Sequence, residues 1–163
     1  MNIDRDLSVE EIFTKAIDHH KNKKIDLAEK LYKNVIKKDP KHIRALNNLG
    51  IIFFSLKKFN KAIEVFEKTI SIDSNYISGH NNLGLLFKKT KNYQKATDSF
   101  KKAIKINPNY FEAHNNIGLL FYELKEYTKA ISSYEKAITI SPNYFETYNS
   151  IGLAFSKCGK YQN

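Results

Sequence analysis

The sequence LNNLG at residues 46–50 decides the fold, because close copies of it return at a fixed interval along the 163-residue chain. The later copies are HNNLG at 80–84, HNNIG at 114–118 and YNSIG at 148–152, and each begins 34 residues after the one before it. Self-similarity at a fixed period in this range is typical of proteins that stack one small supersecondary unit many times. The sequence therefore predicts a repeat architecture.

Other residue types follow the same step of 34 residues. The matching sets are Phe53, Phe87, Phe121 and Phe155; Ala62, Ala96 and Ala130; Phe66, Phe100 and Tyr134; and Phe59, Tyr93, Tyr127 and Tyr161. One step before the first clear copy the chain holds residues of similar size, which are Ala16, Ala28 and Tyr32. A more divergent copy therefore precedes the clear ones.

The turns between units share one register, which holds Pro40, Pro108 and Pro142, with Ser74 in the vacant place. From this register we divide the chain into a lead-in and one array. The predicted segments are the lead-in 1–8, four full units at 9–42, 43–76, 77–110 and 111–144, and the first helix of a fifth unit at 145–163.

Within a unit the apolar residues have helical spacing. Leu46, Leu49, Gly50 and Phe53 fall on one face of a first helix, and a second helix follows after a short polar turn. Glycine inside a helix costs about 1 kcal/mol relative to alanine, so its recurrence needs a steric reason. We expect the bare backbone to let the paired helix approach closely.

These residues resemble the tetratricopeptide repeat, whose pattern joins a leucine–glycine pair, an aromatic three residues on, an alanine, an aromatic four residues later and a proline between units. The resemblance implies an all-α fold, a right-handed α-solenoid of antiparallel helix pairs in which the first helices line a concave groove. The chain departs from the family pattern at the start of the first helix, where the large aromatic is replaced, and in the first unit, where phenylalanine is replaced. The replacing residues are Leu46, His80, His114, Tyr148 and His19.

Paired polar residues recur beside the buried stripe of each first helix. Asparagine forms helices poorly, yet its amide offers the donors and acceptor that complement a peptide backbone. The pairs resemble the asparagine ladder of the repeats in O-linked N-acetylglucosamine transferases, which implies that they clamp an extended polypeptide; Asn48, Asn82 and Asn116 match that position best. The alternatives are compositional bias or amides that bridge neighbouring repeats. The predicted groove residues are Asn47, Asn48, Asn81, Asn82, Asn115, Asn116 and Asn149, with Ser150 in the last place, together with Arg44, Lys88 and Lys89.

The formal charge of +10 invites a nucleic-acid interpretation, because clustered cations release counterions from a phosphate backbone. Only Arg5 and Arg44 are arginine, however, and the lysines are scattered over faces that we expect to be solvated. The third unit is the most basic, and Lys88 and Lys89 would draw an acidic ligand segment to the groove. We therefore favour a protein partner over RNA.

Some tetratricopeptide relatives grip a C-terminal carboxylate with lysine, asparagine and arginine side chains from three units. The corresponding residues here include Phe13, Ile17 and Ser78, so the resemblance argues against binding of that kind. His80 and His114 occupy packing positions, and Cys158 has no partner residues for a metal or a nucleophile. We predict no enzymatic activity, no metal and no cofactor.

Our first hypothesis is a scaffold that binds an extended polypeptide in the groove. The alternative is the substrate-recruiting region of a larger enzyme, such as a glycosyltransferase. No membrane span or secretory signal is visible in the sequence, which predicts a cytoplasmic protein without a membrane partner. The apolar residues Ile151, Leu153 and Phe155 further predict that 145–163 pack on a copy of themselves or on additional repeats.

Overall fold

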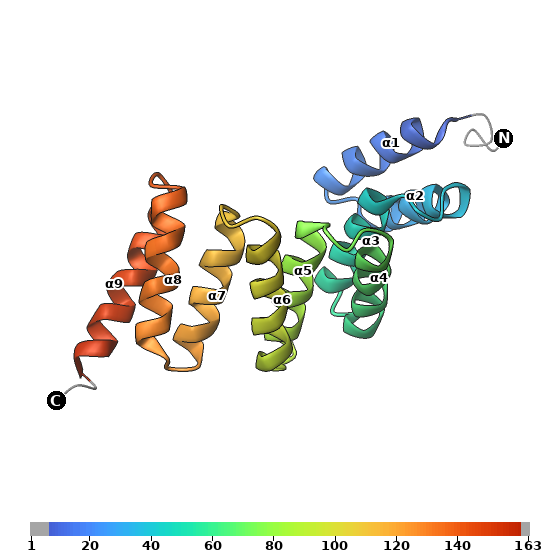
Figure 1. The fold of residues 1–163 in the computed structure, drawn as a ribbon. Helices are drawn as coiled ribbons and strands as arrows, with labels where there is room; N and C mark the ends of the chain where they lie inside the picture. Colours follow the sequence, from blue (N-terminus) through green and yellow to red (C-terminus); the bar gives the residue numbers. More distant parts are fainter. Residues whose placement is uncertain (1–6, 161–163) are drawn as a thin grey trace. The chain divides into compact units, whose positions relative to one another are not determined.

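The computed structural model describes residues 7–160, and these form nine α-helices, the first eight in four hairpin pairs, without a strand (Figure 1). The helices are α1 (Val9–Lys21), α2 (Ile25–Lys38), α3 (Ile43–Ser55), α4 (Phe59–Ile72), α5 (Ile77–Lys89), α6 (Tyr93–Ile106), α7 (Phe111–Glu123), α8 (Tyr127–Ile140) and α9 (Phe145–Lys160). The all-α class and the stacking of helix pairs are confirmed. The right-handed superhelix stays a prediction.

The chain divides into two compact units, residues 1–79 and residues 80–163. The first helices begin at Val9, Ile43, Ile77, Phe111 and Phe145, which are the starts of the predicted repeats. Most of the predicted lead-in, including Arg5, lies outside the described residues, as does Tyr161. Within the described part of the chain, no helix has the length and apolarity to cross a membrane.

The recurring glycines bring the two helices of a hairpin into contact. A Cβ atom added to Gly50 would lie 2.5 Å from the ring of Phe66, and one added to Gly84 would lie 2.5 Å from the ring of Phe100. Gly118 meets the ring of Tyr134 at 2.7 Å in the same way. Because no real Cβ atom tolerates such distances, the predicted close approach is confirmed: the missing side chain leaves the space that the aromatic ring fills.

Alanines on the second helices complete this interlock. Ala62, Ala96 and Ala130 are fully buried, and so are the aromatic rings four residues after each of them. Small side chains therefore alternate with large ones along the inner face of each second helix, as close packing requires.

Every hairpin turn contains a lysine in the left-handed region of the backbone. Lys23, Lys57, Lys91 and Lys125 have φ angles between 57° and 62°. At the first turn, the Lys24 N–H donates to the His19 carbonyl at 2.9 Å and the Lys23 N–H donates to the His20 carbonyl at 3.1 Å. This pair of bonds satisfies the last carbonyls of the helix, and the residue that makes it possible is usually glycine. These left-handed lysines were not among the predictions made from the sequence.

Candidate functional site

In the compact unit of residues 1–79, the ladder asparagines lie at two different depths. Asn47 is only 6% exposed, whereas Asn48 is half-buried. The Asn48 Nδ2 donates to the Tyr32 hydroxyl at 3.2 Å, and that hydroxyl also lies 3.4 Å from the Nδ1 of His20. The ring of Tyr32 is fully buried, so Asn48 gives a buried phenol the polar partner that it needs.

Asn48 also lines a cavity of about 310 Å³ on the first-helix side of this unit. The other lining residues are Ile17, His20 and Lys21 from α1 and Tyr32 from α2. The cavity thus combines an aliphatic wall with an imidazole, an ammonium group, a phenol and an amide. Such a mixture suits one side chain and one peptide group of a bound polypeptide.

In the compact unit of residues 80–163, several ladder asparagines bridge neighbouring repeats. Asn116 Nδ2 donates to the Oδ1 of Asn81 at 3.0 Å, and the buried Thr147 hydroxyl donates to the Oδ1 of Asn115 at 3.0 Å. Asn81 is 6% exposed. These contacts are those of the alternative interpretation, in which the amides join one repeat to the next.

The remaining ladder positions of this unit differ from one another. Asn82 is half-buried and Asn149 is exposed. Ser150 is contacted by the hydroxyl of Tyr134, whose pKa burial raises to about 12, with the hydrogen bond to Ser150 acting in the opposite direction. Ser150 therefore serves the buried Tyr134 hydroxyl as Asn48 serves that of Tyr32.

The structure thus corrects one part of the site prediction. Successive residues of an α-helix are separated by about 100°, so the two side chains of an asparagine pair point in different directions. The side chains of Asn47 and Asn81 turn into the packing between helices and are not available as exposed groove residues. Asn48, Asn82 and Asn116, the positions that we matched to the ladder, keep partial exposure.

Sequence reasoning missed the tyrosine hydroxyls and Thr147, although a signal for the tyrosines was present. In the aromatic column of the second helices, two units carry tyrosine and two carry phenylalanine. A hydroxyl in a buried column needs a hydrogen-bond partner, and the nearest polar column was the ladder itself.

The predicted basic residues have distinct surroundings. The exposed Arg44 places its guanidinium 4.7 Å from the ring centroid of Phe13, and it lines a cavity of about 390 Å³ with Lys41, His42, Ile43, Asp73 and Tyr76. Lys88 lies 3.4 Å from the Glu123 carboxylate, so its charge is partly neutralised. Lys89 is exposed.

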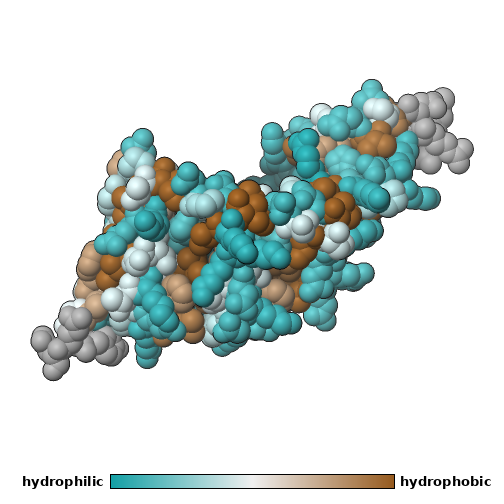
Figure 2. Space-filling view, in the orientation of Figure 1, coloured by the Kyte–Doolittle hydropathy of each residue, from teal (hydrophilic) through white to brown (hydrophobic). Residues whose placement is uncertain are grey.

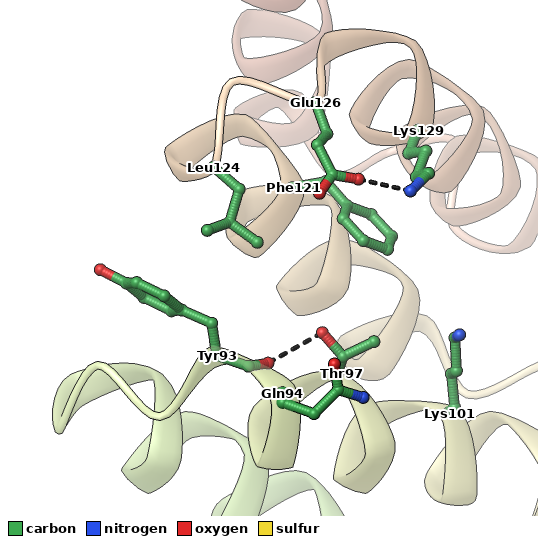
Figure 3. A pocket seen from close by; sticks show the side chains of 8 residues that line it. All are labelled: Tyr93, Gln94, Thr97, Lys101, Phe121, Leu124, Glu126 and Lys129. Atoms are coloured by element: carbon green, nitrogen blue, oxygen red, sulfur yellow. Dashed lines mark hydrogen bonds and ion pairs between the residues drawn. The ribbon is translucent and has the colours of Figure 1, made fainter.

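A further cavity of about 400 Å³ lies in the second unit, away from the predicted ladder (Figure 3). Figure 3 shows Tyr93, Gln94, Thr97 and Lys101 from α6 facing Phe121, Leu124, Glu126 and Lys129, which belong to α7, the following turn and α8. Glu126 forms an ion pair with Lys129. The lining pairs no nucleophile with a base and therefore suggests no reaction.

Known protein families and solved structures match this arrangement of helix pairs. Models described as tetratricopeptide repeat match residues 43–76, 77–110 and 99–132, and a model described as TPR repeat matches 118–159. A crystal structure of the MamA protein has 30% identity and a TM-score of 0.78 over 93% of this chain and 82% of that chain. This chain belongs to the tetratricopeptide repeat family.

Two further solved structures extend the comparison with tetratricopeptide proteins. A second MamA crystal structure has 32% identity and a TM-score of 0.77, over 88% of this chain and 84% of that one. The first TPR of Spaghetti (RPAP3), bound to the HSP90 peptide SRMEEVD, has 21% identity and a TM-score of 0.70, over 74% of this chain and 96% of that one, and shows the shared fold alone. The search of curated proteins gave no match.

His80 and His114, the histidines for which a metal or acid–base role was considered, have structural surroundings. His80 is 5% exposed, and the Nε2 of His114 lies 2.9 Å from the Pro108 carbonyl. Across residues 7–160, no three histidine, cysteine, aspartate or glutamate side chains are grouped so that they could hold a metal ion. Tetratricopeptide proteins generally serve as scaffolds for protein–protein interaction.

Proposed function

We propose that this tetratricopeptide protein is a scaffold that binds an extended polypeptide along its first helices. The observation that carries the proposal is the setting of Asn48. Its amide is oriented by the buried Tyr32 hydroxyl and lines a cavity of about 310 Å³. An amide that is held in place loses little conformational freedom on binding, so its remaining donor and acceptor suit a peptide group.

The charges favour a ligand segment with acidic residues. Arg44, in the compact unit of residues 1–79, is exposed, and so is Lys89, in the compact unit of residues 80–163. Either side chain can attract a carboxylate without first breaking an ion pair with a described residue, whereas Lys88 already contacts Glu123. Electrostatic attraction of this kind mainly raises the rate of association and weakens with salt.

The test is a triple replacement of Asn48, Asn82 and Asn116 by alanine. The probe is an array of immobilised 15-residue peptides, half of them acidic, on which the wild-type chain first identifies ligands. We expect the triple variant to lose at least about tenfold in affinity for those ligands, which corresponds to about 1.4 kcal/mol. Circular dichroism checks that helical content is retained.

A matched control is available because Asn75, Asn109 and Asn143 also recur at steps of 34 residues, in the exposed turns between repeats. Their triple replacement by alanine should leave affinity unchanged. Equal loss in both triple variants, or retained affinity in the first, contradicts a binding role for the ladder.

The alternative interpretations are tested by different readouts. An RNA-binding surface predicts a steep fall of affinity with salt, and a flat response argues against it. A substrate-recruiting region of a larger enzyme predicts that captured peptides are substrates of an attached catalytic domain, and this stays a prediction. We propose the cytoplasm as the location of the protein.

A further inference from the structure

The cavity of about 400 Å³ between α6 and the α7–α8 hairpin has a counterpart in the compact unit of residues 1–79. The two places are related by two steps of the 34-residue repeat, so their residues can be compared one by one. In residues 1–79 the chain places a carboxylate of its own there. The contacts of that carboxylate indicate which chemical group fits the cavity in residues 80–163.

Glu29 of α2 supplies the carboxylate in residues 1–79. It forms ion pairs with Lys33 of the same helix and, at 3.8 Å, with Lys58 in the turn before α4. Both ammonium groups lie over the ring of Phe53, at 5.8 Å and 5.9 Å from its centroid, and this ring is only 4% exposed. The hydrogen bond from Lys33 lowers the pKa of Glu29, and the charge of Lys58 acts in the same direction. One carboxylate thus joins two lysines above an aromatic ring.

The counterpart in residues 80–163 keeps the ring and one lysine but has a neutral side chain in place of the carboxylate. The matching pairs are Phe53 and Phe121, Lys33 and Lys101, and Glu29 and Thr97. The Thr97 hydroxyl donates to the Tyr93 carbonyl at 2.9 Å, so its proton is already engaged. Phe121 is half-buried, whereas Phe53 is buried. A short neutral side chain therefore faces the cavity where residues 1–79 have glutamate.

The charges that line the cavity leave one ammonium group without a counter-charge. Glu126 forms an ion pair with Lys129, whose Nζ also lies 5.5 Å from the centroid of the Phe121 ring. Figure 3 shows Lys101 on α6, across the cavity from this pair. Among the described residues, none forms an ion pair with the exposed Lys101. Two lysines and one glutamate give the lining a net positive charge.

The cavity is accessible and has walls of mixed character. Figure 2 shows apolar side chains reaching the surface among polar ones over the stretch where α6, α7 and α8 lie in Figure 1. The lining combines the ring of Phe121 and the aliphatic Leu124 with the two lysines. Ligand sites in proteins have volumes of about 300–1,000 Å³ and this mixture of apolar walls with a few polar groups.

From these observations we propose that this cavity is a docking site for a glutamate side chain of a partner polypeptide. The carboxylate takes the place that Glu29 has in residues 1–79 and pairs with the ammonium group of Lys101. The methylene groups of the glutamate lie against the ring of Phe121. A polypeptide fits better than a free carboxylate, because the cavity also has room for the residues beside the glutamate. The site lies on second helices and does not depend on the proposed function.

The affinity of this site for a short peptide is expected to be low. An exposed ion pair contributes little to affinity, so we expect a dissociation constant in the millimolar range. Such a contact adds to the avidity of a larger partner that is also held elsewhere. Peptides that bind tightly to the asparagine ladder therefore leave the cavity empty at the concentrations that saturate the ladder.

The test is a two-dimensional NMR titration of the labelled 163-residue chain with the blocked peptide acetyl-Ser-Gly-Ala-Glu-Ala-Gly-Ser-amide. We expect saturable shifts of the backbone amides of Thr97, Lys101 and Leu124. The same peptide with glutamine in place of glutamate should bind at least about fivefold more weakly, because it carries no charge.

Two variants of the protein test the assigned contacts. Lys101→Gln should weaken binding at least about threefold, because it removes the unpaired ammonium group. Thr97→Glu should weaken it to a similar extent, since the new carboxylate can pair with Lys101 four residues later on the same helix. Lys105→Gln is the matched control, because Lys105 is an exposed lysine of α6 that does not line the cavity. It should leave the affinity unchanged.

Equal affinity for the glutamate and glutamine peptides overturns the proposal, as does an equal loss in the Lys101→Gln and Lys105→Gln variants. Sodium acetate that binds the cavity as tightly as the glutamate peptide also overturns it, in favour of a site for free carboxylates. Shifts at Asn82 and Asn116 instead of Thr97 and Lys101 would place the peptide on the ladder, which rejects this site and leaves the proposed function standing.

Discussion

At the scale of single residues, the fold depends on glycines whose missing side chains make room for aromatic rings. Gly84 and Gly152 occupy the same place in the repeat, but only Gly84 faces a ring, that of Phe100. The same substitution therefore has opposite effects at the two sites.

Gly84→Ala should lower the free energy of unfolding by about 1–3 kcal/mol, because its Cβ would lie 2.5 Å from the ring of Phe100. Gly152→Ala should leave stability unchanged or raise it by up to about 1 kcal/mol, since alanine favours the helix and meets no neighbour. Urea denaturation followed by circular dichroism measures both. Equal destabilisation of the two variants contradicts the interlock.

The buried hydroxyl of Tyr134 gives a second prediction at this scale, a dependence of stability on alkaline pH. Burial raises its pKa from 10.0 to about 12, so the folded chain holds this proton more tightly than the unfolded chain does. The resulting contribution to stability is fully present below pH 10 and is lost as pH rises through the folded pKa.

Replacing Tyr134 by phenylalanine removes this ionisation. The difference in free energy of unfolding between wild type and Tyr134→Phe should stay constant from pH 7 to about pH 10 and then shift against the wild type between pH 10 and 12. Thermal unfolding over this range measures the difference. A difference that does not change up to pH 12 shows that the hydroxyl titrates normally.

At the scale of the helical element, the hairpin turns carry a correctable strain. Lys91 has a φ angle of 60°, and a left-handed conformation costs a residue with a Cβ atom roughly 1–2 kcal/mol. Lys91→Gly should therefore raise the free energy of unfolding by about 0.5–1 kcal/mol, after allowance for the greater freedom of glycine in the unfolded chain.

Lys91→Ala is the control for this change, because it removes the charge and keeps the Cβ atom. It should change stability by less than about 0.5 kcal/mol. Denaturant midpoints of the two variants separate the backbone effect from the charge effect. Stabilisation by both variants to the same extent would assign the cost to the lysine charge.

Helix positions and pairing could be predicted because they depend on a pattern that the chain repeats. The glycine and aromatic columns indicated the close approach of paired helices, which the distances at Gly50 and Phe66 confirm. The left-handed lysines could not be predicted, because lysine has no preference for that conformation and the turn residues expected there are glycine and asparagine. Their strain is visible only when the backbone angles are known.

The site was predicted less completely than the helices. Periodicity placed the asparagines beside the buried stripe, but their depth depends on the neighbouring repeat, and no single helix contains that information. Asn81 is buried because Asn116 of the next repeat reaches it, and Asn48 is oriented because the preceding repeat carries tyrosine at position 32. Contacts between repeats decide which amides remain available.

At the scale of the whole molecule, a bound polypeptide is expected to follow the first helices and to leave the second helices untouched. Within each unit, the half-buried ladder amides lie on first helices, whereas the cavity around Tyr93 and Lys101 is formed largely by second helices. A ligand at the ladder asparagines and a ligand in this cavity would therefore affect different residues.

The most direct measurement is a two-dimensional NMR titration of the labelled chain with the tightest peptide from the array. We predict shifts of the side-chain amides of Asn48, Asn82 and Asn116 and of nearby first-helix backbone amides, with those of Tyr93, Lys101 and Lys129 unchanged. Shifts confined to the second helices, or an absence of shifts at the three asparagines at saturating peptide, would contradict the account.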